Sequence, residues 1–153
     1  MKHSVFRFLY KVALPFRRLY WFIARPETCG AKCIIIHNKK VLMIRNTYGH
    51  KRWNFPGGGK KKYETFEQAA IREAYEEVGV QIKNPHFLFE YYQALEYKHD
   101  SVQCFYAFSE TDTFKIDQLE ILEAKWFSLT EIPENRARSV NKIMEVLKQK
   151  VQM

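Results

Sequence analysis

The feature that most constrains the fold is a helix predicted over residues 65–79, because its start, its end and its apolar side can all be identified. Thr65 and Gln68 have the T-x-x-Q spacing of a capping box, and Gly79 is placed to end the helix in a left-handed conformation. Apolar side chains recur at four-residue steps and form one face: Phe66, Ala70, Ala74 and Val78. Since two of them are alanines, the helix can lie close to a sheet.

Three glutamates crowd this helix. Glu73, Glu76 and Glu77 stand at i, i+3 and i+4, so their carboxylates converge. Like charges at this spacing destabilise a helix by roughly 0.2–0.5 kcal/mol per pair, and the Arg72–Glu76 pair offsets part of that. A hard divalent cation would turn the repulsion into coordination, because Mg²⁺ takes oxygen ligands and pairs with substrate phosphates. An acidic, solvated helix face is the alternative, and the cluster alone does not decide between them.

The surrounding residues resemble the Nudix box, G-x5-E-x7-R-E-U-x-E-E-x-G-U, in which U is a bulky aliphatic residue. Every fixed residue of that motif is present: Gly58, Glu64, Arg72, Glu73, Glu76, Glu77 and Gly79. Ala74 is small for the first U position, and Tyr63 stands where glycine is frequent, but neither belongs to the metal-binding set. The W-N-F-P-G-G run before the box also resembles the family.

This resemblance implies a fold and a reaction. The box covers 23 residues, and the order of expected elements is similar from about Thr28 to the C-terminus. The implied fold is an α/β/α sandwich with a mixed sheet, of α/β (α+β mixed) class. The implied reaction is hydrolysis of a pyrophosphate bond in a nucleoside diphosphate linked to another moiety X, by water attack at phosphorus, with Mg²⁺ or Mn²⁺.

The family pattern also implies roles for single residues. Arg72 would orient carboxylates together with Glu64. The metal ions would be held by the box glutamates and one backbone carbonyl: Glu73, Glu76, Glu77 and Gly57. Their task would be to neutralise the pyrophosphate and to activate a water molecule.

A further glutamate often comes from a loop shortly before a Trp-containing strand in this family. Glu120, six residues before Trp126, is the preferred candidate as metal ligand or general base, and Glu123 is the second choice. A solvated acidic loop explains the QLEILE run equally well.

Two residues are expected to contact the substrate. Arg45 ends the predicted strand VLMIR, and a guanidinium fork suits a phosphate, as similar arginines do in the family. A solvated arginine at a strand end is an equal alternative. Gly58 belongs to a triple glycine that lets the backbone approach the metal.

Outside the box, alternating and β-branched runs predict strands. Two strands flank a turn at residues 37–40, and a short strand in WNFPGGG is cut off by Pro56 and the glycines. Further strands are expected at 86–97, 101–110 and 123–129, and a helix at 139–151. Three cysteines, without CxxC spacing, fit free thiols in strands of a reduced, cytosolic protein.

The basic charge is concentrated at the N-terminus. Residues 1–25 hold six basic and no acidic residues, which accounts for +6 of the formal charge of +8. We therefore expect a basic amphipathic segment over 1–26 and a Nudix domain over 27–153. The segment either contacts a membrane surface or a protein, or packs on the domain or in a homodimer.

The expected protein is a cytoplasmic enzyme with a nucleotide-type substrate. A peripheral membrane contact is left open, and RNA is an option that no residue specially indicates. The alternative from another class is a catalytically silent Nudix domain that senses or binds nucleotides or RNA. The intact box glutamates favour the enzyme.

Overall fold

The computed structural model describes residues 27–95 and 98–151. Its elements are, in chain order, β1 (Glu27–His37), β2 (Lys40–Asn46), β3 (Gly57–Gly59), α2 (Phe66–Val78), β4 (His86–Leu95), β5 (Lys98–Phe108), β6 (Ile121–Ser128) and α3 (Arg138–Val151). The predicted amphipathic segment lies outside the described residues, so it and the domain boundary after residue 26 stay predictions.

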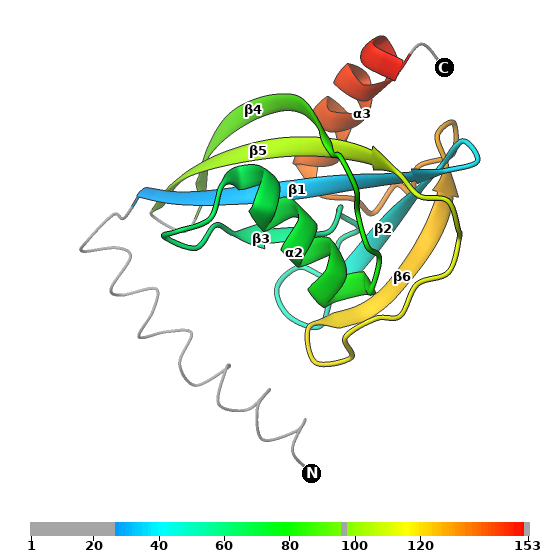
Figure 1. Cartoon of the computed structure of the whole chain (residues 1–153), viewed down its shortest axis with the longest axis horizontal. Coiled ribbons are helices and arrows are strands. Elements are labelled where there is room, and N and C mark those ends of the chain that lie inside the picture. Colours follow the sequence, from blue (N-terminus) through cyan, green and yellow to red (C-terminus); the bar gives the residue numbers. More distant parts are fainter. Residues whose placement is uncertain (1–26, 96–97, 152–153) are drawn as a thin grey trace.

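The six strands form one mixed sheet in the order β4-β5-β1-β2-β6, with β3 paired to β1 (Figure 1). β1 runs parallel to β5, and every other pairing is antiparallel. β3 pairs with the first half of β1, where Gly59 lies opposite Gly30, and β2 pairs with its end, where Val41 lies opposite Ile36. β1 is therefore the central strand that places the glycines.

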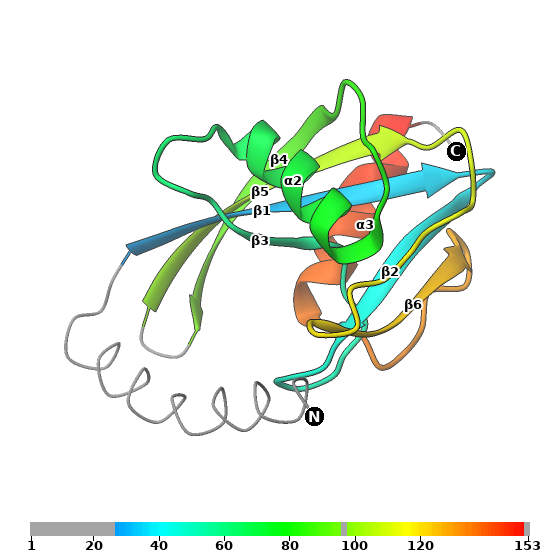
Figure 2. The same cartoon turned by 60° about the horizontal axis from the view of Figure 1, so that its bottom comes forward.

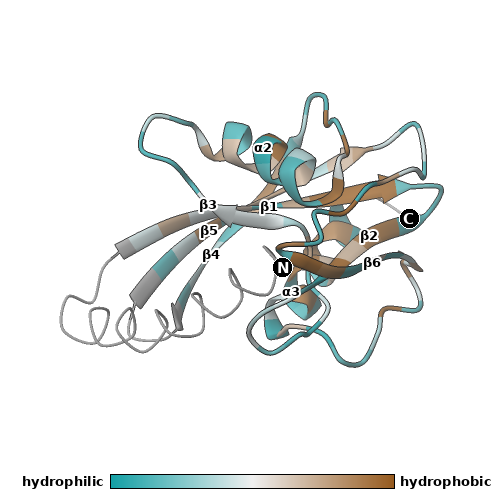
Figure 3. Ribbon diagram, turned by 90° about the horizontal axis from the view of Figure 1, so that it is seen from below, coloured by the Kyte–Doolittle hydropathy of each residue, from teal (hydrophilic) through white to brown (hydrophobic). Residues whose placement is uncertain are grey.

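The helices cover opposite faces of the sheet (Figures 2 and 3). Ala31, Cys33 and Ile35 of β1 belong to the core cluster under α2, whereas Ile34 and Ile36 belong to the cluster under α3. This alternation follows from the two-residue period of a strand. The expected α/β/α sandwich is confirmed.

The prediction for the WNFPGGG run was wrong. The glycines do not end a strand; they are strand β3, while Trp53 and Asn54 form only isolated bridges. Gly57 has φ 154°, and a Cβ there would collide with the carbonyl oxygen of Ala31. Glycine is disfavoured in strands by local propensity, but here its missing side chain allows close approach of two backbones.

Other local predictions hold. Asn38 and Lys39 both have positive φ, as a two-residue hairpin turn between β1 and β2 requires. The cysteines are free, and Cys33 and Cys104 are buried in strands. Over the residues described, neither helix has the length and apolar character that a membrane crossing needs.

Candidate active site

Helix α2 positions the glutamates, and local sequence fixes where it begins and ends. The Gln68 N–H donates to the Thr65 hydroxyl at 3.1 Å, and the Thr65 N–H donates to the Gln68 side chain at 2.8 Å. Gly79 has φ 67°, and its N–H donates to the Tyr75 carbonyl. Both expected caps are confirmed. The helix therefore holds its carboxylates at fixed places along β3.

Arg72 is the hub of the carboxylate network. It binds Glu64 with two N–H groups, at 2.6 and 3.0 Å, and Glu73 and Glu76 at 2.7 and 2.9 Å. A further N–H donates to the Gly59 carbonyl at 3.0 Å. Hydrogen bonding from Arg72 lowers the pKa of Glu64 to about 2. One guanidinium thus fixes three carboxylates relative to the glycine strand.

Glu77 is the only buried charged residue in the described part of the chain, with 3% of its surface exposed. Its carboxylate accepts a hydrogen bond from the Gly57 N–H at 2.8 Å. Burial raises the pKa of Glu77 to about 8, and repulsion by Glu73 and Glu120 adds to the rise, while the Gly57 N–H and Lys32 oppose it. The charged form of Glu77 is therefore poorly compensated by the protein.

Glu120 lies immediately before β6 and faces the same carboxylates. Desolvation raises its pKa, and repulsion by Glu73, Asp117 and Glu76 raises it further. Because these charges act on Glu120, its carboxylate is close to the box glutamates in space. This is consistent with Glu120 as the downstream carboxylate, which stays a prediction.

Arg45 and Glu123 pair with each other instead. The Arg45 guanidinium lies 3.1 Å from the Glu123 carboxylate, donates to the Lys51 carbonyl at 3.1 Å, and lies 5.6 Å from the centre of the Trp53 ring. Both β2 and β6 place these residues directly opposite one another. Arg45 would have to leave Glu123 to reach a phosphate.

The four carboxylates near β3 are chemically suited to bind a hard divalent cation. Glu73, Glu76, Glu77 and Glu120 offer only oxygens. Desolvation is the main cause of the raised pKa values of Glu77 and Glu120, and repulsion by neighbouring carboxylates adds to it. Within the described ranges, no three such side chains are already gathered as a metal-binding group. Glu73 and Glu76 are bound to Arg72, so metal binding would require these carboxylates to turn.

Gly58 allows the close approach of Glu73. A Cβ on Gly58 would lie 2.6 Å from a Glu73 carboxylate oxygen, whereas a Cβ on Gly59 would meet nothing within 4 Å. We expect Gly58→Ala to push the Glu73 carboxylate aside and to lower the free energy of unfolding by about 1 kcal/mol, because the hydrogen bond from Arg72 to Glu73 is lost. Gly59→Ala is the matched control and should change it by less than about 0.5 kcal/mol. Urea unfolding of both variants tests this, and equal losses would contradict it.

Buried Glu77 should make the metal-free protein less stable as pH rises. Its folded pKa is about 8 against an ordinary value of 4.5, so between these values the folded state binds more protons than the unfolded state. The free energy of unfolding then falls with rising pH, by on the order of 5 kcal/mol in total. Urea unfolding in chelator should show this fall between about pH 5 and about pH 8 for the native protein and not for Glu77→Gln. The same pH dependence of stability in the native protein and in Glu77→Gln would contradict this expectation.

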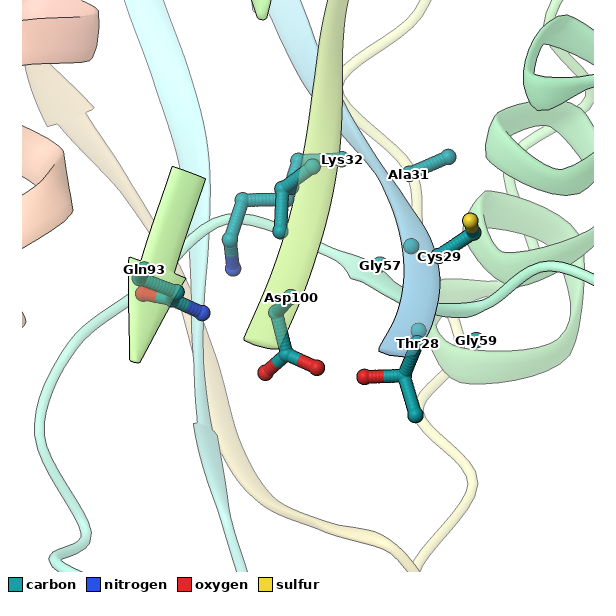
Figure 4. A pocket seen from close by; sticks show the side chains of 11 residues that line it. Thr28, Cys29, Ala31, Lys32, Gly57, Gly59, Gln93 and Asp100 are labelled. Carbon is teal, nitrogen blue, oxygen red and sulfur yellow. The ribbon is translucent and has the colours of Figure 1, made fainter. Parts of the chain in front are cut away.

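A pocket that the sequence analysis missed lies beside β3, with a volume of about 330 Å³ (Figure 4). Four polar side chains line it: Thr28, Lys32, Gln93 and Asp100. Burial lowers the pKa of Lys32, and attraction to Cys104 and Glu77 partly offsets this. Lys32 could have been found in the sequence, because it is the one charge within the apolar run 31–36.

Comparisons with known proteins agree with this geometry. A family model described as NUDIX domain matches residues 28–147. The chain is 30% identical over 118 residues to a NAD-capped RNA hydrolase of Haemophilus influenzae, covering 71% of this chain and 43% of that protein. It is 40% identical over 65 residues to an RNA pyrophosphohydrolase of Actinobacillus succinogenes, covering 42% of this chain and 33% of that protein. The chain thus spans less than half the length of these relatives.

Solved structures show the same fold. A MutT NUDIX hydrolase from Burkholderia pseudomallei superposes with TM-score 0.73 at 20% identity, over 80% of this chain and 98% of that one. The NUDIX domain of Shewanella oneidensis NrtR, solved with ADP ribose, superposes with TM-score 0.71 at 17% identity, over 82% of this chain and 89% of that one. Because the family model covers most of the chain and the box lies on the expected helix, this protein belongs to the Nudix family.

Proposed function

We propose that this protein is a metal-dependent pyrophosphohydrolase that cleaves a nucleoside diphosphate linked to another moiety X. The observation that carries the proposal is the poorly compensated charge of buried Glu77, bound to the Gly57 backbone and repelled by Glu73 and Glu120. A structural acidic helix face would leave Glu73 and Glu77 in water. Instead Glu77 is buried against the Gly57 backbone and Glu73 lies close to Gly58, beside a strand that has no side chains.

Four carboxylates and one backbone group would hold the metal: Glu73, Glu76, Glu77, Glu120 and the Gly57 carbonyl. When bound, Mg²⁺ or Mn²⁺ supplies charge neutralisation at the pyrophosphate and lowers the pKa of a water molecule. The protein's own residues position the carboxylates that would bind the metal. Arg72 and Glu64 keep the helix carboxylates facing β3, because Arg72 also binds the Gly59 carbonyl.

Glu120 is the group best suited to take a proton from the attacking water. Its raised pKa makes its carboxylate a stronger base than an ordinary glutamate, and it is exposed enough to meet water. Arg45 would contact a phosphate after exchanging Glu123 for the substrate, since one N–H of its guanidinium already binds an anionic oxygen and a guanidinium fork suits a phosphate. Gly58 lets the substrate's phosphates approach the backbone closely.

A second candidate within the same chemistry is the 5′ end of RNA. It is favoured by the names of two relatives, a NAD-capped RNA hydrolase and an RNA pyrophosphohydrolase. A strong salt dependence of RNA binding would reveal it, because contacts to successive phosphates release counterions.

We also propose that residues 27–153 form the catalytic domain and that residues 1–26 are a separate segment.

The test is Mg²⁺-dependent turnover of a nucleotide panel, followed by phosphorus NMR with the full chain. The panel holds nucleoside triphosphates, ADP-ribose, nucleotide sugars, CDP-alcohols, dinucleoside polyphosphates and a 5′-triphosphate RNA. Cleavage of one class at a pyrophosphate bond supports the proposal. If folded, metal-loaded protein cleaves none of them, a silent nucleotide-binding domain becomes the better explanation.

A further inference from the structure

We infer that the pocket beside β3 binds the base of the substrate and prefers guanine to adenine, with Asp100 and Lys32 as the residues that set this preference. The inference rests on the proposed function for the position of the pyrophosphate. The pocket's volume, about 330 Å³, falls in the range of roughly 300–1,000 Å³ that is usual for ligand sites.

Strand register builds one wall of this pocket. Asp100 of β5 lies opposite Thr28 of β1 and opposite Gln93 of β4, so these three residues form one row across three strands. Residues paired in this way lie side by side on the same face of the sheet. In the next row, Gly30 lies opposite Val102. Because Gly30 has no side chain, this second row is low at β1, whereas Val102 and Tyr91 continue it with side chains on β5 and β4.

Lys32 closes the other end. It lies two residues beyond Gly30 on the same face of β1, and Figure 4 shows its ammonium group directed toward Gln93 and Asp100. An amine N–H donor and a carboxylate acceptor thus reach the same space from different strands. Such a pair recognises a planar ligand that offers acceptors and donors along one edge.

An unsatisfied hydroxyl also points to a polar ligand. The Oγ1 atom of Thr28 is buried and has no hydrogen-bond partner among the described residues. A buried polar group without a partner is costly, by roughly 1–3 kcal/mol, and is rare in folded proteins. Figure 4 shows the Thr28 oxygen on the side of Asp100. A ligand polar atom between them would satisfy it.

Guanine has the edge that fits. Its N1–H and N2 amino group are adjacent donors, which the Asp100 carboxylate can accept in addition to the interaction that Asp100 already makes. Its O6 is an acceptor beside them and suits the Lys32 amine. Adenine has a lone pair at N1, where guanine has a donor, so adenine would place an acceptor against a carboxylate. A site whose half-buried polar groups pair with one ligand disfavours the other, because those groups are then left without partners.

The pocket is also correctly placed for the reaction. Gly57, Gly58 and Gly59 line it on one side, while Gly58 and Gly57 contact Glu73 and Glu77 on the other. Since the glycines have no side chains, a substrate can cross β3 with its base in the pocket and its pyrophosphate at the carboxylates. The implied substrate class is a guanosine diphosphate linked to X.

The test uses the non-hydrolysable α,β-methylene diphosphates of guanosine, inosine and adenosine, with Mg²⁺ and the full chain, in calorimetric titrations. We expect the guanosine compound to bind at least about tenfold more tightly than the adenosine compound, with inosine between them because it lacks the N2 amino group. In Asp100→Asn the affinities for the guanosine and adenosine compounds should differ by no more than about threefold, because an amide can both accept and donate a hydrogen bond. Lys32→Met should weaken guanosine binding by at least about tenfold.

Exposed residues of the same types give the controls, Asp112→Asn and Lys148→Met, which should bind as the native protein does. Equal binding of the three compounds by the native protein, or tighter binding of adenosine, overturns the inference without any variant. Turnover of GDP-linked and ADP-linked substrates separates the two proposals. Turnover with no base preference overturns the inference alone. Guanosine-selective binding without turnover of any substrate supports the inference and overturns the proposed function.

Discussion

Glu77→Gln is expected to lower Mg²⁺-dependent turnover by at least about 10³-fold while the protein stays folded. Glutamine keeps the size of the side chain, and its amide oxygen can still accept the hydrogen bond from the Gly57 N–H. What it loses is the charge that a cation needs. The variant therefore separates the electrostatic role of Glu77 from its packing role.

Thermal unfolding gives a readout that does not depend on catalysis. For the native protein, Mg²⁺ at about 100 times its Kd should add about 2.7 kcal/mol to the free energy of unfolding, since it binds only the folded state. Glu77→Gln should lose most of that gain. Glu67→Gln, an exposed position in the first turn of the same helix, is the matched control and should keep it. A Glu77→Gln protein that keeps both turnover and the Mg²⁺ response would refute the assigned metal site.

The parts of this site that depend on local sequence were predictable. The capping box at Thr65, the glycine after α2 and the placement of three glutamates on this helix all follow from residues within one helix. Their physical cause is short-range hydrogen bonding and helical spacing, which a single sequence displays directly.

The parts that depend on long-range pairing were not. Gly57–Gly59 has the composition of a loop, and only its fit between β1 and α2 makes it a strand. The pocket was missed for the same reason, because Thr28 and Asp100 are brought together by a parallel pairing of distant strands. Lys32 was the one residue in the sequence that pointed to the pocket, because it is a charged residue within an apolar strand. The residues that face Lys32 could not be identified from the sequence.

The choice between Glu120 and Glu123 shows how these two kinds of information combine. Both come within six residues before Trp126, so spacing alone does not separate them firmly. In the structure Glu123 lies opposite Arg45 within the β2–β6 ladder, and the register shifts just beyond that pair. Glu120 falls outside the ladder, where its side chain is free to face α2.

Glu120→Gln should therefore reduce kcat by roughly 10²–10³-fold, the usual contribution of a general base. Because a raised pKa belongs to the carboxyl that accepts the proton, the variant should also lose the fall in rate on the acid side of the pH–rate profile. Glu123→Gln is the matched control, three residues away and exposed, and its turnover should stay within about threefold of the native protein.

The two variants also test which role Glu120 has. If it mainly moves a proton, Glu120→Gln keeps most of the stabilisation by Mg²⁺ and loses kcat. If it mainly holds the metal, the Mg²⁺ response weakens together with kcat, because a ligand is missing. A larger loss in Glu123→Gln than in Glu120→Gln would contradict both roles and would make the Arg45–Glu123 pair part of the catalytic machinery.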